Sequence, residues 1–352
     1  MKKILMTSGA ALMLSAGYAS ANALDTISFA GDGRMGVVYD NTNDDEFSID
    51  SRVRGYFFFD AETDTGLGFG GRIRIGNAAG AQDSDLGGSG YNHVYVESEF
   101  GRVEVGDVAS AAQAATGDIT GSVGFTGIGF QNETDFLVRD FNGGLAAGAI
   151  NAGGGSFESA ADNDDFDDAF TSRNKALYIY ELDAFSVFGS TGAIDGPFRH
   201  YSVGARYDAG MFAASVGFEY AEADDGWALV DNDDIATDGG DATHLTGSVE
   251  GSFDMFDAKL VGTYAGGDLG DSLDDADLNQ WQLGVGAGTT FDLVSVNAFA
   301  RQDFFKDRHF GVGASYDLGG GASIDAGIRH TRVNDDDDDN VTQADLGVSM
   351  SF

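Results

Sequence analysis

Five arginines share a spacing that would place them together on one face of a sheet. Each has the opposite parity to neighbouring apolar residues, so in extended strands the basic and apolar side chains point to opposite faces. They fall close together although the whole chain has only 19 lysines and arginines. Their chemistry is electrostatic, because a guanidinium is always charged and can hold or orient anionic groups. The five residues are Arg34, Arg52, Arg54, Arg72 and Arg74.

Acidic residues of a long connecting segment, 107–173, form a possible counterpart. Two facing rows of opposite charge would create a transverse field that orients polar solutes and penalises apolar ones. Such rows would form a constriction with a basic wall and an acidic loop. The alternative is that the arginines pair with carboxylates of their own wall, and that the loop acids are ordinary solvated charges. The loop carboxylates are Asp107, Asp118, Glu133, Asp135 and Asp140.

Other chemistry has little support, so the chain is not expected to be an enzyme. Gly66, Gly68 and Gly71 have dinucleotide-binding spacing, but a strand follows them where that motif requires a helix. The five histidines show no metal spacing. No cofactor is expected to be required, although acidic runs could bind Ca²⁺ through hard oxygen ligands. None fits an EF-hand, and solvated loops bridged loosely by divalent ions to lipid headgroups are the alternative; the runs are 162–168, 231–241, 268–277 and 335–339.

The elements that must position these residues are strands with one apolar and one polar or glycine face. Phe310, Val312 and Ala314, for example, alternate with Gly311 and Gly313. We count sixteen strands, many of about ten residues, the length that a tilted strand needs to cross a bilayer. A soluble sandwich would also alternate. Short turns that alternate with long acidic loops, and aromatic residues near strand ends, favour a transmembrane antiparallel β-barrel.

Composition agrees with an exported all-β chain. There are 53 glycines, one proline and no cysteine, and a near absence of proline suits strands that must donate to a ladder. Residues 1–23 have the anatomy of a signal peptide, with cleavage after Ala23 or, as the alternative, after Ala21. Residues 24–352 then form a single barrel domain, with 107–173 as one long connection after the fifth strand. The net charge of −39 excludes binding nucleic acid by phosphate neutralisation.

Several segments carry a resemblance to a known family. The most specific is 311–324, and 31–37, 51–54, 102–107 and 344–348 also fit. On these residues the chain resembles the general diffusion porins of Rhodobacter-type alphaproteobacteria. The resemblance implies a Gram-negative outer-membrane channel of sixteen strands that assembles as a homotrimer. It also implies that the third loop, 107–173, folds into the lumen, where its carboxylates would face the five arginines in a constriction. The channel would let small hydrophilic solutes and ions pass passively.

The ends and the surface suggest partners. The last strand alternates and ends on Phe352, which is similar to the membrane-insertion signal read by the barrel-assembly machinery. Lipid and lipopolysaccharide are expected around the barrel. Small residues on the outer face predict close contact between subunits through the first and last strands, namely Gly31, Gly33, Gly55 and Gly71. The acidic charge predicts weak cation selectivity. A substrate-selective channel or adhesin-like barrel, and a secreted calcium-binding β-roll, are the alternatives.

Overall fold

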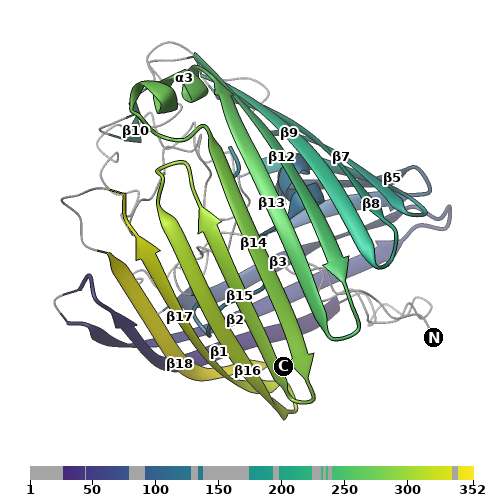
Figure 1. Ribbon diagram of the computed structural model, residues 1–352. Helices are drawn as coiled ribbons and strands as arrows, with labels where there is room; N and C mark the ends of the chain where they lie inside the picture. Colours follow the sequence, from purple (N-terminus) through teal and green to yellow (C-terminus); the bar gives the residue numbers. More distant parts are fainter. Residues whose placement is uncertain are drawn as a thin grey trace, which may run out of the picture.

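The computed structural model describes residues 27–43, 45–78, 92–127, 134–137, 174–192, 198–223, 231–232, 235–236, 240–334 and 340–352. Sixteen of the described strands close into one antiparallel barrel (Figure 1), which confirms the predicted fold class and strand number. The ring closes where the first strand pairs with the last, with Asp32 opposite Ser351 and Asp40 opposite Gln343. The predicted signal peptide lies outside the described residues.

Consecutive strands are neighbours in the ring, because short connections favour antiparallel hairpins. The barrel strands are β1 (Ile27–Asp40), β2 (Phe47–Glu62), β3 (Gly68–Ala78), β4 (His93–Ser98), β5 (Gly101–Asp107), β6 (Asn174–Leu182), β7 (Phe185–Gly192), β8 (Phe198–Asp208), β9 (Phe212–Ala223), β12 (Gly240–Ser252), β13 (Phe256–Gly267), β14 (Trp281–Phe291), β15 (Val294–Gln302), β16 (Arg308–Gly319), β17 (Ala322–Arg332) and β18 (Val341–Ser351). Between β9 and β12, β10 (Asp231–Asn232) and β11 (Ile235–Ala236) form a separate two-stranded sheet.

Short turns at one end of the barrel use residues that tolerate positive φ. Asp183 and Asp292 adopt φ values of 52° and 55°. Gly320, between β16 and β17, has a φ of 66°, and both neighbouring glycines are also positive. Such turns match the twist of the flanking strands. The beginning of β1 and the end of β18 lie on this side of the barrel, where Gly31 and Phe352 exchange two backbone hydrogen bonds.

The two faces of the barrel wall differ in polarity. Large apolar side chains point outward and are exposed, as for Val203, Val216 and Leu245, which keep 58, 51 and 51% of their surface. Ser202 of β8 and Glu219 of β9, which have the opposite parity, point inward and are buried. This is the arrangement of a barrel whose outer face contacts lipid, and the reverse of a sandwich. No described helix is long and apolar enough to cross a membrane.

Three of the four outward glycines of the first strands are covered by rings of the same chain, whereas a Cβ on Gly33 would make only ordinary contacts of 3.5 Å or more. A Cβ on Gly31 would lie 2.3 Å from the Phe352 ring, and one on Gly71 would lie 2.6 Å from the Phe59 ring. On Gly55 the Phe29 ring is 3.1 Å away. Aromatic side chains on neighbouring strands thus fill the space above the glycines. At Gly31, Gly55 and Gly71 the space that was expected to receive a second subunit is therefore occupied by the chain itself, and the homotrimer stays a prediction.

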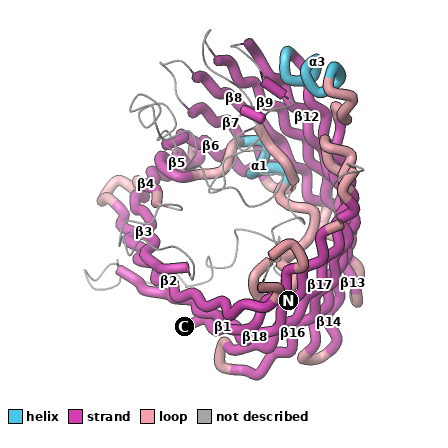
Figure 2. Tube along the Cα trace, turned by 90° about the vertical axis from the view of Figure 1, so that its left-hand side faces the viewer, coloured by secondary structure: helices cyan, strands magenta, loops and turns pink. Residues whose placement is uncertain are grey.

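Two described helices lie in the connections between strands. α1 (Ala111–Thr116) follows β5, and α3 (Asp268–Asp275) follows β13. Figure 2, a view into the ring, shows α1 inside the barrel against the strands β7 to β9 and α3 at the rim. Leu269 and Leu273 of α3 pack with Leu137 and Phe304 in a buried apolar cluster. This cluster lies towards the barrel end that is opposite to the short turns.

Candidate pore-lining site

The arginines of β1 and β2 form a ladder with carboxylates of the same wall. Arg34 Nε lies 2.7 Å from Asp50. Asp32 lies 3.3 Å from Arg52 and 2.9 Å from Arg54, and it also accepts a hydrogen bond of 2.9 Å from the Tyr56 hydroxyl. The register explains the pairing, because Asp32 stands opposite Arg54 and Arg34 opposite Arg52. Inward orientation, as predicted from parity, holds for these three arginines.

The two arginines of β3 continue the same face. Arg74 stands opposite Tyr56 and is buried, with 6% of its surface exposed. Arg72 is half-buried and lies between Phe58 of β2 and His93 of β4 in the register. The five arginines are therefore brought together on one wall, as the sequence predicts. Their role in a constriction stays a prediction.

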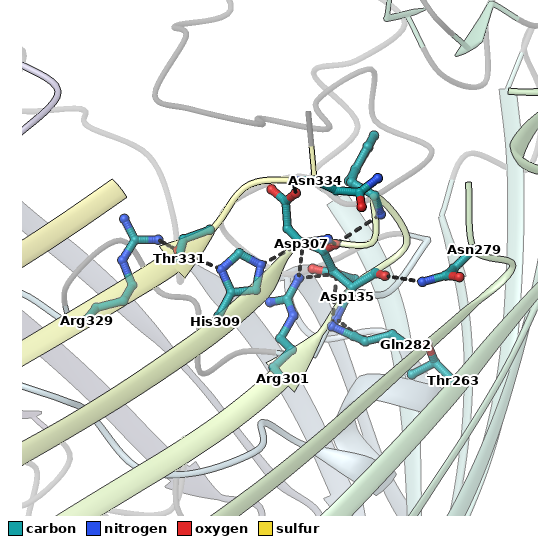
Figure 3. Close-up of polar contacts among 12 residues, drawn as sticks. Asp135, Thr263, Asn279, Gln282, Arg301, Asp307, His309, Arg329, Thr331 and Asn334 are labelled. Atoms are coloured by element: carbon teal, nitrogen blue, oxygen red, sulfur yellow. Dashed lines mark hydrogen bonds and ion pairs between the residues drawn. The ribbon is translucent and has the colours of Figure 1, made fainter. Parts of the chain in front are cut away.

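Three of the five predicted loop carboxylates fall within the described residues. Asp107 is buried at the end of β5, and Asp118 accepts a hydrogen bond of 3.3 Å from the backbone of Thr134. Asp135 lies 2.5 Å from Arg301 on β15 and accepts a 3.0 Å hydrogen bond from Gln282 on β14 (Figure 3). Glu133 and Asp140 lie outside the described residues. The described counter-charges of Arg34, Arg52 and Arg54 are thus Asp32 and Asp50 of the same wall, and the expected dependence of the arginine row on loop acids stays a prediction.

The first part of the loop is attached to the inner wall at both ends of α1. The Ala111 and Ala112 N–H groups at its start donate to Ser190 and Ser202 hydroxyls, at 2.8 and 2.9 Å. At its end, the Lys259 ammonium donates to the Thr116 carbonyl. These contacts satisfy backbone groups that a helix terminus leaves unpaired. A helix of only six residues is therefore held by the barrel wall.

Inward glycines make room for the loop along the wall. A Cβ on any of them would come within 2.9 Å of a loop atom, closer than real Cβ atoms approach their neighbours. On Gly286, for example, it would lie 2.4 Å from the Ile119 carbonyl oxygen. The loop can follow the wall closely because these positions lack side chains. This glycine row comprises Gly204, Gly217, Gly284, Gly286, Gly313, Gly347 and Gly36.

At Gly347 and Gly36, the last glycines of the row, the loop reaches the seam between β18 and β1. Arg34 Nη1 donates to the carbonyls of Phe125 and Thr126, at 3.2 and 3.1 Å. Asp345 of β18 accepts hydrogen bonds from the Thr126 N–H and hydroxyl, at 2.8 and 2.6 Å. Arg34 thus contacts both the wall ladder and the loop. It positions the loop in addition to contributing charge.

A second loop segment is held by a buried triad that parity and spacing did not reveal. Glu219 accepts hydrogen bonds from the rings of His200 and His244, at 3.2 and 3.1 Å. The same carboxylate accepts a 2.9 Å bond from the Leu137 N–H, and the Phe136 ring packs edge-on against His244. All five residues are almost fully buried. Because buried charges require partners, this triad fixes residues 134–137 to the wall.

Replacing Glu219 by alanine is expected to lower the free energy of unfolding by about 3 kcal/mol, because it leaves two imidazoles and one backbone donor buried without their acceptor. Glu222→Ala is the matched control, since Glu222 lies on the outward face of the same strand and is 42% exposed. That control should cost less than about 1 kcal/mol. Urea unfolding of the lipid-reconstituted protein, followed by tryptophan fluorescence, measures both. Equal losses in the two variants would show that the triad does not anchor the loop.

One further acidic group was missed because its members are unremarkable in sequence. Asp303, Asp307 and His309 bring ligand atoms within 4.8 Å of one another at the end of β15 and the start of β16. Asp303 accepts a 2.7 Å hydrogen bond from His309 and also accepts from two backbone N–H groups. Burial, with the nearby Asp303 charge, raises the pKa of Asp307, although the N–H of Asn334 opposes the shift. Internal hydrogen bonds thus account for this cluster.

The predicted acidic runs are placed only in part. Run 268–277 contains α3, with Asp268 and Asp271 in its first turn, where carboxylates stabilise a helix. Runs 162–168 and 335–339 lie outside the described residues. Calcium binding by these runs stays a prediction.

Comparisons with known proteins agree with this geometry. A family model described as Gram-negative porin matches residues 8–337. A porin of Rhodobacter capsulatus is 28% identical over 350 residues, which cover 93% of this chain and 100% of that protein. A porin structure refined at 1.8 Å has 25% identity and a TM-score of 0.68, and it covers 93% of this chain and 100% of its own. A variant of a Rh. blastica porin shares the fold at 20% identity, with a TM-score of 0.64 and the same coverage.

The closed barrel, its outward apolar face and its inward charged face therefore coincide with similarity over nearly the whole chain. Porins are passive channels and not enzymes, and they are located in the outer membrane. The chain belongs to the Gram-negative porin family.

Proposed function

We propose that this porin lets small hydrophilic solutes and ions diffuse passively and that it weakly prefers cations. The observation that supports this most directly is the inner face, where Arg34, Arg52 and Arg54 alternate with Asp32 and Asp50 in half-buried pairs. Such pairing largely cancels the local basic charge. The acidic surplus of the rest of the chain, with a net charge of −39, then sets the overall preference.

Reversal potentials across planar bilayers in a salt gradient test this proposal. We expect modest cation selectivity at low salt that fades towards 1 M, because the Debye length falls from about 10 Å at 0.1 M to about 3 Å at 1 M. Anion selectivity at low salt would contradict it. A flux that saturates with one solute class would favour the substrate-selective channel instead.

The remaining partners stand as proposals of the same kind. The outer-membrane placement is compatible with assembly as a homotrimer and with contact to lipid and lipopolysaccharide. It is also compatible with recognition of Phe352 by the barrel-assembly machinery and with loose binding of Ca²⁺. Phe352 itself is 67% exposed and lies at the end of β18. Its accessibility supports a role as a recognition signal.

A further inference from the structure

We propose that the outward face of β13 to β17 binds a phosphorylated lipid of the outer leaflet. Its phosphate would contact Arg308 and Arg332, and one acyl chain would lie in the groove below them. The inference depends on the outer-membrane placement of the chain. It does not depend on what passes through the lumen, so its test can fail while the proposed function stands.

The acyl-chain groove is an apolar depression with a volume of about 250 Å³ on the outer wall. Four of its lining residues are consecutive register partners across β13 to β16, namely Leu260, Val285, Ala300 and Phe310. Ala300 is the smallest of the four and lies between Val285 and Phe310. A methyl group flanked by larger side chains leaves a dent into which a hydrocarbon chain can pack. The outward apolar residues that line the groove are Leu260, Leu283, Val285, Ala300 and Phe310.

The register row at the upper edge of the groove is basic, and its residues Gln302 and Arg308 also line the groove. Gln302 pairs with Arg308, and Arg308 stands directly opposite Arg332. Both arginines are exposed, and the Arg308 Nε donates only a long hydrogen bond of 3.4 Å to Gln302. Among the described residues neither arginine has an ion pair with a carboxylate. Like charges directly opposite each other destabilise a strand pair, and a phosphate between them would relieve this.

A neighbouring outward arginine shows the usual arrangement. Arg199 on β8 lies 3.2 Å from Glu222, its register partner on β9. In the described strands, Arg199, Arg308 and Arg332 are the basic residues with outward parity. The unbalanced pair is therefore unusual for an outer wall, and more so in a chain with a net charge of −39.

Aromatic residues fix the depth of this site in the membrane. Tyr264 and Trp281 are register partners one row further towards the rim, and they keep 51 and 42% of their surface exposed. Tyrosine and tryptophan gather at the headgroup level of membranes. The two arginines therefore lie close to the headgroups, and the groove below them faces the hydrocarbon. His330, opposite Phe310, adds a third nitrogen-bearing side chain to the same face.

Native mass spectrometry of the full chain, titrated with diphosphorylated lipid A, tests the proposal. The double variant Arg308→Gln/Arg332→Gln should bind this lipid roughly thirtyfold more weakly, because two surface arginines each contribute to the attraction of an anionic headgroup. Ala300→Leu fills the groove without changing charge and should weaken binding severalfold. Arg199→Gln, the matched outward control, should leave affinity unchanged.

Two probes separate lipid from a small anion. Dephosphorylated lipid A should bind the unaltered chain as weakly as the diphosphorylated lipid binds the double variant, and millimolar inorganic phosphate should not displace the lipid. Undiminished lipid binding by the double variant, or full displacement by inorganic phosphate, would overturn the proposal. If the double variant does not assemble into a barrel, Ala300→Leu decides alone, and unchanged affinity in that variant overturns it.

Discussion

Replacing Arg52 and Arg54 by glutamine is expected to increase the cation selectivity of the pore and to change its conductance. Both guanidinium groups lie on the inner face within 3.3 Å of Asp32. Their removal leaves that carboxylate without its nearest cations. Two unit charges at about 8 Å in a water-like medium act on a passing ion with about 1 kcal/mol in total, which corresponds to a roughly fivefold change in permeability ratio.

The direction of the selectivity change can also be tested with a variant of Asp32, the acidic partner of both arginines. Asp32→Asn keeps both arginines and removes their counter-charge, so it should reduce cation selectivity. The double variant Arg308→Gln/Arg332→Gln removes two positive charges from the outer wall and serves as the matched control, because neither side chain faces the lumen.

Reversal potentials and single-channel conductance measure these effects at low salt, where screening is weak. If Arg52→Gln/Arg54→Gln leaves both quantities unchanged while the barrel is intact, these arginines are structural. The constriction assignment would then be wrong, and the pairing of arginines with wall carboxylates would be their whole role.

The strands and their faces could be predicted from sequence because they follow a local rule. Successive side chains of a strand alternate between faces, so the parity of Arg52 and Arg54 against Val53 already places them inward. The predicted span 174–182 equals β6, and 322–332 equals β17. The pairing of the arginines with a carboxylate of their own wall was also an open alternative, because Asp32 lies two residues from Arg34 on the same face.

The path of the loop could not be predicted, because its contacts join residues far apart in sequence. Thr126 contacts Asp345, 219 positions away, and Ala111 contacts Ser190, 79 positions away. α1 is too short for a helical period to stand out in its sequence. The glycines that receive the loop were visible as the non-apolar face of each strand, but their partner was not.

α3 was hidden by its composition. Its residues belong to an acidic run, and strongly acidic sequence is typical of solvated loops. The single apolar signal is the spacing of Leu269 and Leu273, four positions apart, which places both on one helix face. That pair is buried against Leu137 and Phe304, so tertiary packing and not propensity decides the helix.

Enlarging a glycine that receives the loop is expected to narrow the pore. In Gly286→Ala the new Cβ would lie 2.4 Å from the Ile119 carbonyl oxygen and 2.7 Å from Thr120 Cβ, against 3.4 Å or more in ordinary contact. The wall strand is held by its ladders to β13 and β15. The loop must therefore move by about 1 Å, and the free direction for it is into the lumen.

Gly262→Ala provides the matched control on the neighbouring strand β13. Gly262 faces outward, and a Cβ there would meet Leu283 at 3.7 Å, an ordinary contact. Both variants change the same residue type in the same kind of strand, so differences in strand propensity cancel.

Single-channel conductance and the swelling rate of proteoliposomes in sugars of increasing size measure the opening. Gly286→Ala should lower conductance and shift the size limit downward, with a further decrease for Gly286→Val, whereas Gly262→Ala should match the unaltered chain. Equal conductance in all of them would mean that the loop at Ile119 does not border the narrowest part of the lumen, because a displacement towards the axis would then leave the limiting cross-section unaffected.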